Sequence, residues 1–282
     1  MAQVWLITGA SRGLGRALAE AVLAAGHRLV ATARDPAAFD DLVARWGDHV
    51  LPLALDVTDP RAADEAVRKA VEMFGRLDVL VNNAGYGNMG SVEETSLEDF
   101  RAQIETNLFG VIIVTKAAIP VLRAQGSGHI IQVSSVGGRV GATGRAPYSA
   151  AKWGVEGFSE VLAKEMAAVG VKVSIIEPGG FRTDFAGPST TIHAGLPEYD
   201  AVVGAAARFQ RAYNGKQPGD PAKAASVVLR VAAMDEPPLH LLLGSDAVET
   251  VGRSDTARME ADRKWRELSV STDFAQGDPG VA

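Results

Sequence analysis

A phenol and an amine stand at a spacing that could support acid–base chemistry. Tyr148 and Lys152 open a stretch with amphipathic helical periodicity, so a spacing of four residues places both side chains on one helical face. An unperturbed tyrosine has a pKa of about 10 and is a poor base at neutral pH, but a nearby ammonium favours the phenolate. Tyr148 could then exchange a proton with a carbonyl or alcohol oxygen. The alternative is a solvent-facing helix pair.

Ser135 and Asn107 extend this hypothesis. Ser135 follows a predicted buried strand and so lies at the sheet edge where ligands bind, where its hydroxyl could hold a substrate oxygen beside Tyr148. Asn107 lies inside a long helical pattern, although asparagine disfavours helix interiors. We expect a kink or bound water there, which could connect Lys152 to solvent; a tolerated polar residue is the alternative.

A glycine-rich turn follows the first predicted strand and precedes a helix. Glycines let the backbone approach a pyrophosphate, and the helix amino terminus supplies free N–H groups. A strand-to-helix turn without a ligand is the alternative. We predict dinucleotide contacts from Gly9, Ser11, Arg12, Gly13, Leu14 and Gly15.

The end of the second predicted strand distinguishes the two nicotinamide cofactors. An acidic residue there would bind the ribose 2′-hydroxyl, whereas an arginine accommodates a 2′-phosphate. The sequence has Ala33 at this place, then Arg34 and Asp35, and Arg12 offers a second guanidinium. We predict NADP(H), with NAD(H) as the alternative; Asp35 is the counter-evidence, and the charges could simply be solvated.

Two further segments fit the cofactor groove. Asp56 and Val57 follow the third predicted strand and could flank the adenine. Asn83, Ala84 and Gly85 follow the fourth and could line the groove at the carboxyl edge of a parallel sheet. The alternative is that both segments form Asx turns.

Short apolar runs alternate with amphipathic stretches, which predicts an α/β fold with a doubly wound, Rossmann-type parallel sheet and helices on both faces. The predicted strands are Val4–Thr8, Arg28–Ala33, Val50–Ala54, Val79–Asn82, His129–Ser134, Val171–Glu177 and His240–Leu243. The predicted helices are Gly13–Ala25, Pro60–Phe74, Leu97–Ala124, Tyr148–Val169 and Pro221–Ala233.

Two segments interrupt this alternation. The region 180–219 is rich in glycine, proline and aromatic residues and is predicted to be an irregular lid. We therefore predict one domain over 1–244 and a carboxyl-terminal extension over 245–282. The extension has a charged helical pattern around Thr256–Leu268, and poor order is expected from about Ser271.

Composition narrows the class of protein. The 282 residues are 47% hydrophobic and 22% charged, with a net charge of −6 and no cysteine. The lack of cysteine excludes disulfides and thiolate chemistry. The negative net charge indicates no basic surface for nucleic acid. No signal peptide and no apolar run of about 20 residues is apparent, so we expect a cytoplasmic protein that does not bind membranes. The scattered histidines predict no metal site.

Together these residues closely resemble the short-chain dehydrogenase/reductase family, and the resemblance covers Met1–Leu243. It is carried by motifs in the family's order, which are Thr8–Gly15, Asp56, Asn82–Gly85, Asn107, Ser135, Tyr148, Lys152 and Pro178-Gly179. The family implies a seven-stranded sheet and a catalytic tetrad of Asn107, Ser135, Tyr148 and Lys152.

The resemblance carries further implications. Tyr148 and Lys152 would also bind the cofactor, Lys152 through the nicotinamide ribose, and Pro178, Gly179, Phe181 and Thr183 would contact the nicotinamide end. Family members commonly assemble as homo-dimers or tetramers. The extension looks similar to the branch of 17β-hydroxysteroid dehydrogenases, which puts the common tetramer in doubt because the extension could cover its interface.

The substrate is expected to be a small ketone, aldehyde or secondary alcohol with a hydrophobic body. Apolar walls could come from Tyr86, Met89, Val136, Val140, Thr143, Phe181, Phe185, Leu196, Tyr199, Phe209 and Tyr213. Packing within the lid is the alternative, and it is favoured for Phe209 and Tyr213. His193 could contact a polar substituent or be an exposed loop residue.

Three other functions compete. A catalytically silent NADP-binding sensor would not need Ser135, Tyr148 and Lys152 together. A serine hydrolase is disfavoured because no Gly-x-Ser-x-Gly elbow is present. An NAD-linked alcohol dehydrogenase stays open, because the sequence does not fix the direction of the reaction.

Overall fold

A parallel sheet forms the centre of the molecule in this computed structural model, which describes residues 2–187, 189–193 and 195–274. Its seven strands follow the order β3-β2-β1-β4-β6-β7-β9, and every neighbouring pair is parallel. The strands are β1 Val4–Thr8, β2 Arg28–Ala33, β3 Val50–Ala54, β4 Val79–Asn82, β6 Gly128–Val133, β7 Val171–Pro178 and β9 His240–Leu243. The predicted doubly wound fold, with all seven strands, is confirmed.

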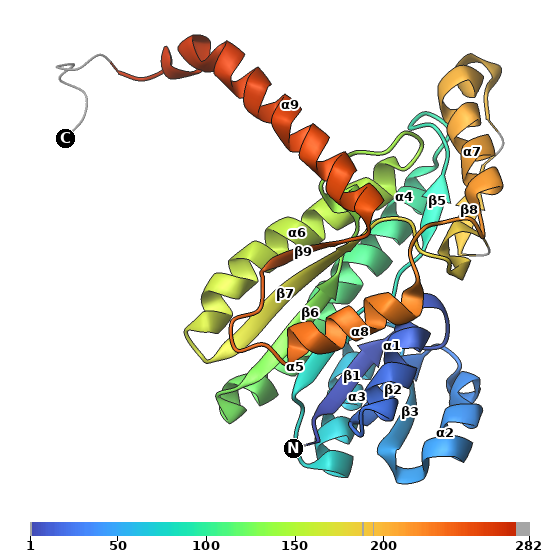
Figure 1. Cartoon of the computed structure of the whole chain (residues 1–282), viewed down its shortest axis with the longest axis vertical. Coiled ribbons are helices and arrows are strands. Elements are labelled where there is room, and N and C mark those ends of the chain that lie inside the picture. The colour runs from blue at the N-terminus through green and yellow to red at the C-terminus, as the bar shows by residue number, and fades with distance from the viewer. Residues whose placement is uncertain (1, 188, 194, 275–282) are drawn as a thin grey trace.

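Helices cover both faces of the sheet (Figure 1). One apolar core lies under α1 and α8 and includes Trp5, Ile7 and Phe39. The other lies under α3, α5 and α6 and includes Leu6, Leu80 and Ile130. Since alternate residues of β1 enter opposite cores, the strand is buried along its whole length. These helices are α1 Gly13–Ala24, α3 Pro60–Phe74, α5 Gly110–Gln125, α6 Ala146–Ala167 and α8 Pro221–Ala232.

The predicted helix Leu97–Ala124 is interrupted. It consists of α4 (Leu97–Ile104), a π-helical segment (Glu105–Phe109) and α5. By length and mean hydropathy the stretch Leu97–Gln125 could cross a membrane, although charged residues such as Lys116 interrupt it, so that it holds no continuous apolar run of about 20 residues. A core helix passes the same test, and here α4 packs on α6 while α5 packs on α3.

Three segments differ from their predictions. A short helix, α2 (Asp40–Trp46), was not predicted. The lid is more regular than expected, since it contains β8 (Thr190–Ile192), which pairs with β5 (Gly87–Met89), and α7 (Ala205–Tyr213). Propensity over such short stretches is weak, and these elements form because neighbouring segments pair or pack with them.

The extension forms one long helix, α9 (Ser245–Val270). The predicted helical pattern around Thr256–Leu268 covers only its second half. Figure 1 shows α9 running away from the body of the protein, and only Ala247 and Val251 of this helix are buried. Poor order is expected from about Ser271 onward. The structure describes Ser271–Phe274, and residues 275–282 lie outside the described residues.

Candidate active site

The turn between β1 and α1 leaves no room for a side chain at Gly9. Gly9 has a φ of +63°, and a Cβ there would stand 2.8 Å from the Cα of Ala84. Helix α1 begins with no side-chain cap and has no acidic residue in its first turn. Free N–H groups and a positive dipole end favour a bound anion. The turn therefore fits the pyrophosphate of a dinucleotide.

The predicted Asn83–Gly85 segment fastens this turn. The Asn83 amide nitrogen donates to the carbonyl oxygens of Thr8 and Gly9 at 2.9 and 3.0 Å. The Thr8 hydroxyl accepts from the backbone nitrogens of Asn83 and Ala84, a role that the sequence did not indicate. These bonds fix the backbone of the groove before any ligand arrives.

The groups predicted to choose the cofactor lie exposed beside the turn. Arg12 and Arg34 are both exposed, and among the described residues neither forms an ion pair within 4 Å. Asp35 caps the turn 36–39 by accepting from the Ala37 nitrogen at 3.0 Å. Asp35, whose carboxylate is the counter-evidence to the NADP(H) prediction, therefore stabilises a local turn.

Asp56 and Val57 take up different positions. Asp56 is exposed and accepts from the nitrogen and hydroxyl of Thr58 at 3.0 and 2.8 Å. These bonds, aided by Arg34, lower the pKa of Asp56. Val57 is buried, and a Cβ on Gly110 would stand 2.6 Å from its side chain. The Asx turn considered above is therefore present, and one Asp56 oxygen takes part in it.

Ser135, Tyr148 and Lys152 meet at the carboxyl edge of the sheet. Tyr148 and Lys152 lie in the first two turns of α6, with 6% and 4% of their surfaces exposed. The Lys152 ammonium donates to the Val133 carbonyl at 2.7 Å and lies 5.9 Å from the centre of the Tyr148 ring. Ser135 follows β6, and its hydroxyl is close enough to the phenol to lower its pKa. The three predicted groups thus share one site.

Burial controls the charges at this site. It raises the pKa of Tyr148, and Ser135 and Arg145 oppose this only in part. It also lowers the pKa of Lys152 to about 8, with Glu156 opposing. The sequence-based expectation that the ammonium brings the phenol's pKa down is therefore not met by the protein groups, because desolvation of the phenolate is the larger effect. At neutral pH the phenol is protonated.

Asn107 lies in the π-helical segment and is completely buried. Its amide donates to the Tyr86 carbonyl at 2.9 Å and to Gln103 Oε1 at 2.8 Å, and it accepts from the Tyr86 nitrogen at 3.1 Å. The predicted irregularity of this helix is thus present. Asn107 therefore holds the segment after Gly85 in place through its bonds with Tyr86. The proton path from Lys152 to solvent stays a prediction.

The residues predicted at the nicotinamide end follow β7. The Gly180 nitrogen donates to Asp246 of α9 at 2.7 Å, just after Pro178 and Gly179. Thr183 packs on the glycine turn, since a Cβ on Gly13 would stand 3.3 Å from its Cβ. Phe181 bridges to Gly219. The two ends of the lid therefore meet beside the predicted pyrophosphate turn.

The predicted substrate walls separate into two groups. The Phe185 ring centre lies 5.4 Å from that of Tyr148, so this lid residue reaches the site. Phe209 and Tyr213 stack on each other, and Phe209 is 64% exposed, which agrees with packing within the lid. The remaining candidates are Met89, buried; Tyr86, Val136, Val140, Phe181, Tyr199 and His193, half-buried; and Thr143 and Leu196, exposed.

One residue at the site gave no signal in the sequence. Arg145 precedes α6, and its guanidinium carbon lies 5.9 Å from the ring centres of both Tyr148 and Phe185. From the sequence alone, an arginine in a loop is interpreted as a solvated surface charge. Its position beside the rings of Tyr148 and Phe185 depends on the tertiary structure.

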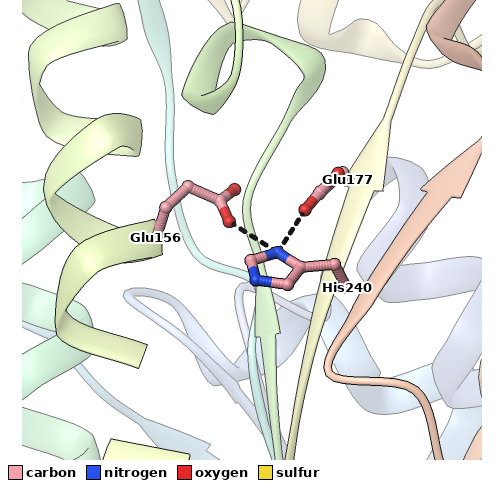
Figure 2. A group of neighbouring side chains, drawn as sticks. All are labelled: Glu156, Glu177 and His240. Atoms are coloured by element: carbon pink, nitrogen blue, oxygen red, sulfur yellow. Dashed lines mark hydrogen bonds and ion pairs between the residues drawn. The ribbon is translucent and has the colours of Figure 1, made fainter. Parts of the chain in front are cut away.

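A network of buried and half-buried ionisable groups joins the middle of α6 to β7 and β9 (Figure 2). His240 Nδ1 lies 2.8 Å from Glu177 Oε1 and 3.4 Å from Glu156 Oε2. Their ligand atoms lie within 4.8 Å of one another, a spacing that a metal ion could bridge. Arg139, however, donates to both oxygens of Glu177 at 3.2 Å and supplies counter-charge. The expectation of no metal site stays an expectation.

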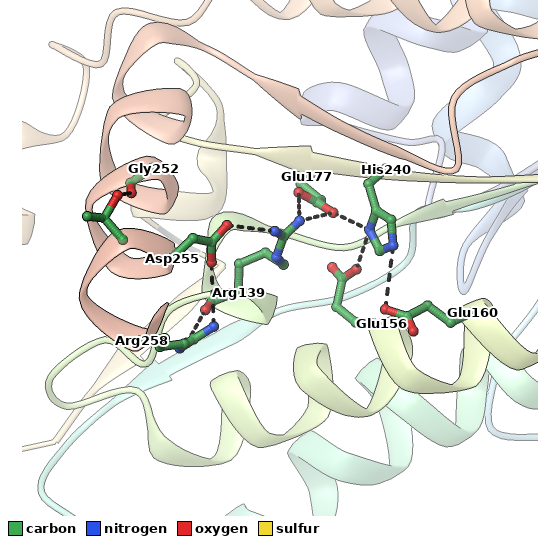
Figure 3. Close-up of polar contacts among 9 residues, drawn as sticks. Arg139, Glu156, Glu160, Glu177, His240, Gly252, Asp255 and Arg258 are labelled. Atoms are coloured by element: carbon green, nitrogen blue, oxygen red, sulfur yellow. Dashed lines mark hydrogen bonds and ion pairs between the residues drawn. The ribbon is translucent and has the colours of Figure 1, made fainter. Parts of the chain in front are cut away.

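The network fastens α9 to the loop that carries Ser135 (Figure 3). Arg139 follows this loop and pairs with Asp255 of α9 at 3.1 Å. Arg258 donates to the Arg139 carbonyl at 2.6 Å and stacks over the Trp153 ring. The first half of α9 is thus attached to both the loop and α6.

Glu156→Gln is expected to stabilise the protein at pH 8 but not at pH 5. Burial and Glu177 raise the pKa of Glu156 to about 7. The folded state therefore favours the protonated form, and the stability that this form contributes is present below pH 4.5 and lost as the pH rises through 7. Glutamine mimics the protonated form, so we expect a gain of about 1–3 kcal/mol at pH 8 in denaturant unfolding.

Glu165→Gln is the matched control, because Glu165 lies exposed on the same helix and forms no ion pair within 4 Å among the described residues. It removes the same charge without the burial, so its effect should differ little between the two pH values. A stability difference for Glu156→Gln that is the same at pH 5 and pH 8 would contradict the raised pKa.

Comparison with known proteins identifies the family of this chain. The model of the family described as short chain dehydrogenase matches residues 3–192. Oxidoreductase BOA17 of Botryotinia fuckeliana is 50% identical over 273 residues, which are 96% of this chain and all of that protein. A short-chain dehydrogenase structure from Streptomyces avermitilis has a TM-score of 0.89 at 42% identity and covers 96% of this chain and 98% of its own.

A second solved structure contains a cofactor analogue. The alcohol dehydrogenase of the archaeon Thermococcus sibiricus, complexed with 5-hydroxy-NADP, has a TM-score of 0.71 at 28% identity, covering 86% of this chain and 96% of its own. The family model spans most of this chain, and the Botryotinia fuckeliana protein aligns with this chain over the whole of its own length. This chain therefore belongs to the short-chain dehydrogenase family.

Proposed function

We propose that the chain transfers a hydride between NADP(H) and a hydrophobic ketone, aldehyde or secondary alcohol. The carrying observation is that Ser135, Tyr148 and Lys152 converge at the sheet edge where the glycine turn opens. A silent sensor would have no need to bury a phenol and an ammonium together, since burying unpaired polar groups costs stability.

The proposed chemistry divides between cofactor and protein. When bound, the reduced nicotinamide supplies the hydride that the carbonyl carbon accepts. Ser135 positions the carbonyl oxygen, and Tyr148 donates its phenolic proton to that oxygen as negative charge develops. Lys152 stabilises the resulting phenolate. Burial raises the pKa of Tyr148 and so favours the protonated phenol, which is the form that donates this proton.

The cofactor choice depends on two arginines. Arg12 and Arg34 lie exposed beside the turn, and Asp35 is engaged in a local cap. A 2′-phosphate would find two guanidinium groups there. The NADP analogue bound to the Thermococcus sibiricus relative supports the same choice.

Several predictions from the sequence accompany this proposal. They are the contacts of Pro178, Gly179, Phe181 and Thr183 with the nicotinamide, a homo-oligomer, a cytoplasmic location, one domain over 1–244 and the branch similar to 17β-hydroxysteroid dehydrogenases. Asp255 and Asp246 hold the beginning of α9 against this domain.

A substrate screen tests the proposal. NADPH absorbance is followed with purified protein and panels of ketones, aldehydes and secondary alcohols, and each active compound is repeated with NADH. We expect NADPH consumption with several hydrophobic ketones. Tight NADPH binding without turnover of any compound would favour the sensor instead.

The rate of reduction is expected to fall as the pH rises through about 8. Lys152 has a pKa of about 8, so the ammonium that stabilises the phenolate is present below this pH and lost above it. The pH profile of kcat/KM for ketone reduction measures this limb. Lys152→Arg should move the limb to higher pH, because a guanidinium stays protonated. A profile flat from pH 6 to 10 would remove Lys152 from the mechanism.

A further inference from the structure

Arg145 is a partly buried cation, and one of its guanidinium nitrogens lacks an acceptor among the described residues. Its Nη1 atom is sealed from solvent and has no hydrogen-bond partner in the described part of the chain. Burial lowers the pKa of its guanidinium, and the only described group that opposes this is Tyr148. A guanidinium keeps its proton even so. The chain thus holds an uncompensated positive charge beside the candidate catalytic phenol.

The surroundings of Arg145 hold it in place. A Cβ on Gly87 would stand 3.1 Å from Arg145 Nη1 and 3.3 Å from the end of the Phe185 ring. The guanidinium carbon lies at 5.9 Å from the ring centres of both Phe185 and Tyr148. Strand β5, the lid and α6 therefore enclose the cation at the place where the substrate must approach Tyr148.

Such an arrangement is costly unless a ligand completes it. A guanidinium has five N–H donors in a rigid fork, and burying even the two donors of Nη1 without an acceptor destabilises the fold. The other partly or fully buried cations described at this edge have partners: Lys152 donates to Val133, and Arg139 pairs with Glu177 and Asp255. An incoming carboxylate matches the fork and can accept two of its hydrogen bonds.

We propose that Arg145 binds a carboxylate of the substrate, so that the chain acts on oxo acids or hydroxy acids with an apolar body. The inference rests on the proposed function, because Tyr148 marks where the reacting oxygen lies. The rings of Phe185 and Tyr148 would cover the apolar part of the substrate, while Arg145 fixes its charged end. This narrows the expected substrates from neutral ketones to carboxylate-bearing ones.

The kinetic test compares acids with their neutral esters. Acetoacetate, levulinate and 4-acetylbenzoate are each paired with the methyl ester, and kcat/KM is measured with NADPH for the wild type, Arg145→Met and Arg145→Lys. For at least one pair the wild type should prefer the acid by about 10- to 100-fold. Arg145→Met should remove this preference by lowering activity on the acid far more than on the ester, and Arg145→Lys should restore part of it. Arg101→Met, an exposed change on α4, controls for lost charge.

Two kinetic results would overturn the proposal. One is a wild type that prefers no acid over its ester. The other is an Arg145→Met variant that loses acid and ester activity equally, since Arg145 would then act through Tyr148 and not on the substrate.

A binding measurement separates this proposal from the redox proposal. Isothermal titration of the NADPH complex uses 4-ethylbenzoate and methyl 4-ethylbenzoate, which cannot be reduced at a ketone. The wild type should bind the acid about 10-fold more tightly than the ester, and Arg145→Met should not. Acid binding without turnover of any carbonyl would sink the redox function and keep the anion site. Equal binding of acid and ester, with ketone turnover intact, would sink the anion site alone.

Discussion

Tyr148→Phe is expected to lower kcat for ketone reduction by about 10²- to 10⁴-fold, the usual contribution of a positioned general acid. The variant removes only the phenolic oxygen, and the ring keeps its contact with Phe185. Affinity for NADPH, measured by fluorescence titration, should stay nearly unchanged, because the glycine turn and the two exposed arginines are untouched. The loss should therefore appear in turnover and not in cofactor binding.

Ser149→Ala is the matched control for this variant. Ser149 follows Tyr148 in α6 and is also buried, with 7% of its surface exposed, so its loss removes a hydroxyl of similar depth from the same helix. It should keep most of the activity. Turnover that survives in Tyr148→Phe would show that another group supplies the proton, and the tetrad would have to be reassigned.

The second large effect concerns the cofactor. Replacing Arg12 and Arg34 together by serine is expected to lower kcat/KM for NADPH relative to NADH by about 100- to 1,000-fold, since each charge-assisted bond to the 2′-phosphate contributes about 1.5–3 kcal/mol. Both side chains are exposed, so the fold should tolerate the change. Steady-state kinetics with each cofactor and one active ketone measures the ratio.

Two further variants make this result interpretable. Arg61→Ser removes an exposed arginine from the start of α3 and should leave the ratio unchanged. Ala33→Asp places a carboxylate at the end of β2, where it could bind a ribose 2′-hydroxyl, and should raise the NADH activity. A wild type that already prefers NADH would show that Arg34 and Asp35 were misinterpreted.

The strands could be predicted almost to the residue. Strands covered on both faces are continuous apolar runs, and Val4–Thr8, Val50–Ala54 and Val79–Asn82 are found as predicted. The order of the glycine turn, Ser135, Tyr148 and Lys152 along the chain also placed the candidate site. In a parallel α/β sheet each of these motifs follows a strand, so all must arrive at one edge.

The less regular elements could not be predicted this way. Helix α7 lies in a stretch rich in glycine, proline and aromatic residues, and β8 has three residues that pair only because β5 lies beside them. The π-helical segment at Asn107 was foreseen only as a kink. Its form depends on hydrogen bonds with Tyr86, twenty-one residues earlier in the chain.

The sequence by itself determined the family, the sheet and the candidate residues for proton exchange, because these follow from residue type and spacing. Only the tertiary structure decided their electrostatics. Burial raises the pKa of Tyr148, whereas the neighbouring ammonium alone suggested a lowered pKa. Burial also leaves Nη1 of Arg145 without a hydrogen-bond partner among the described residues. The tertiary structure also brings together Glu156 of α6, Glu177 of β7 and His240 of β9. Desolvation and pairing depend on what packs around a group, and that is fixed by contacts between distant segments.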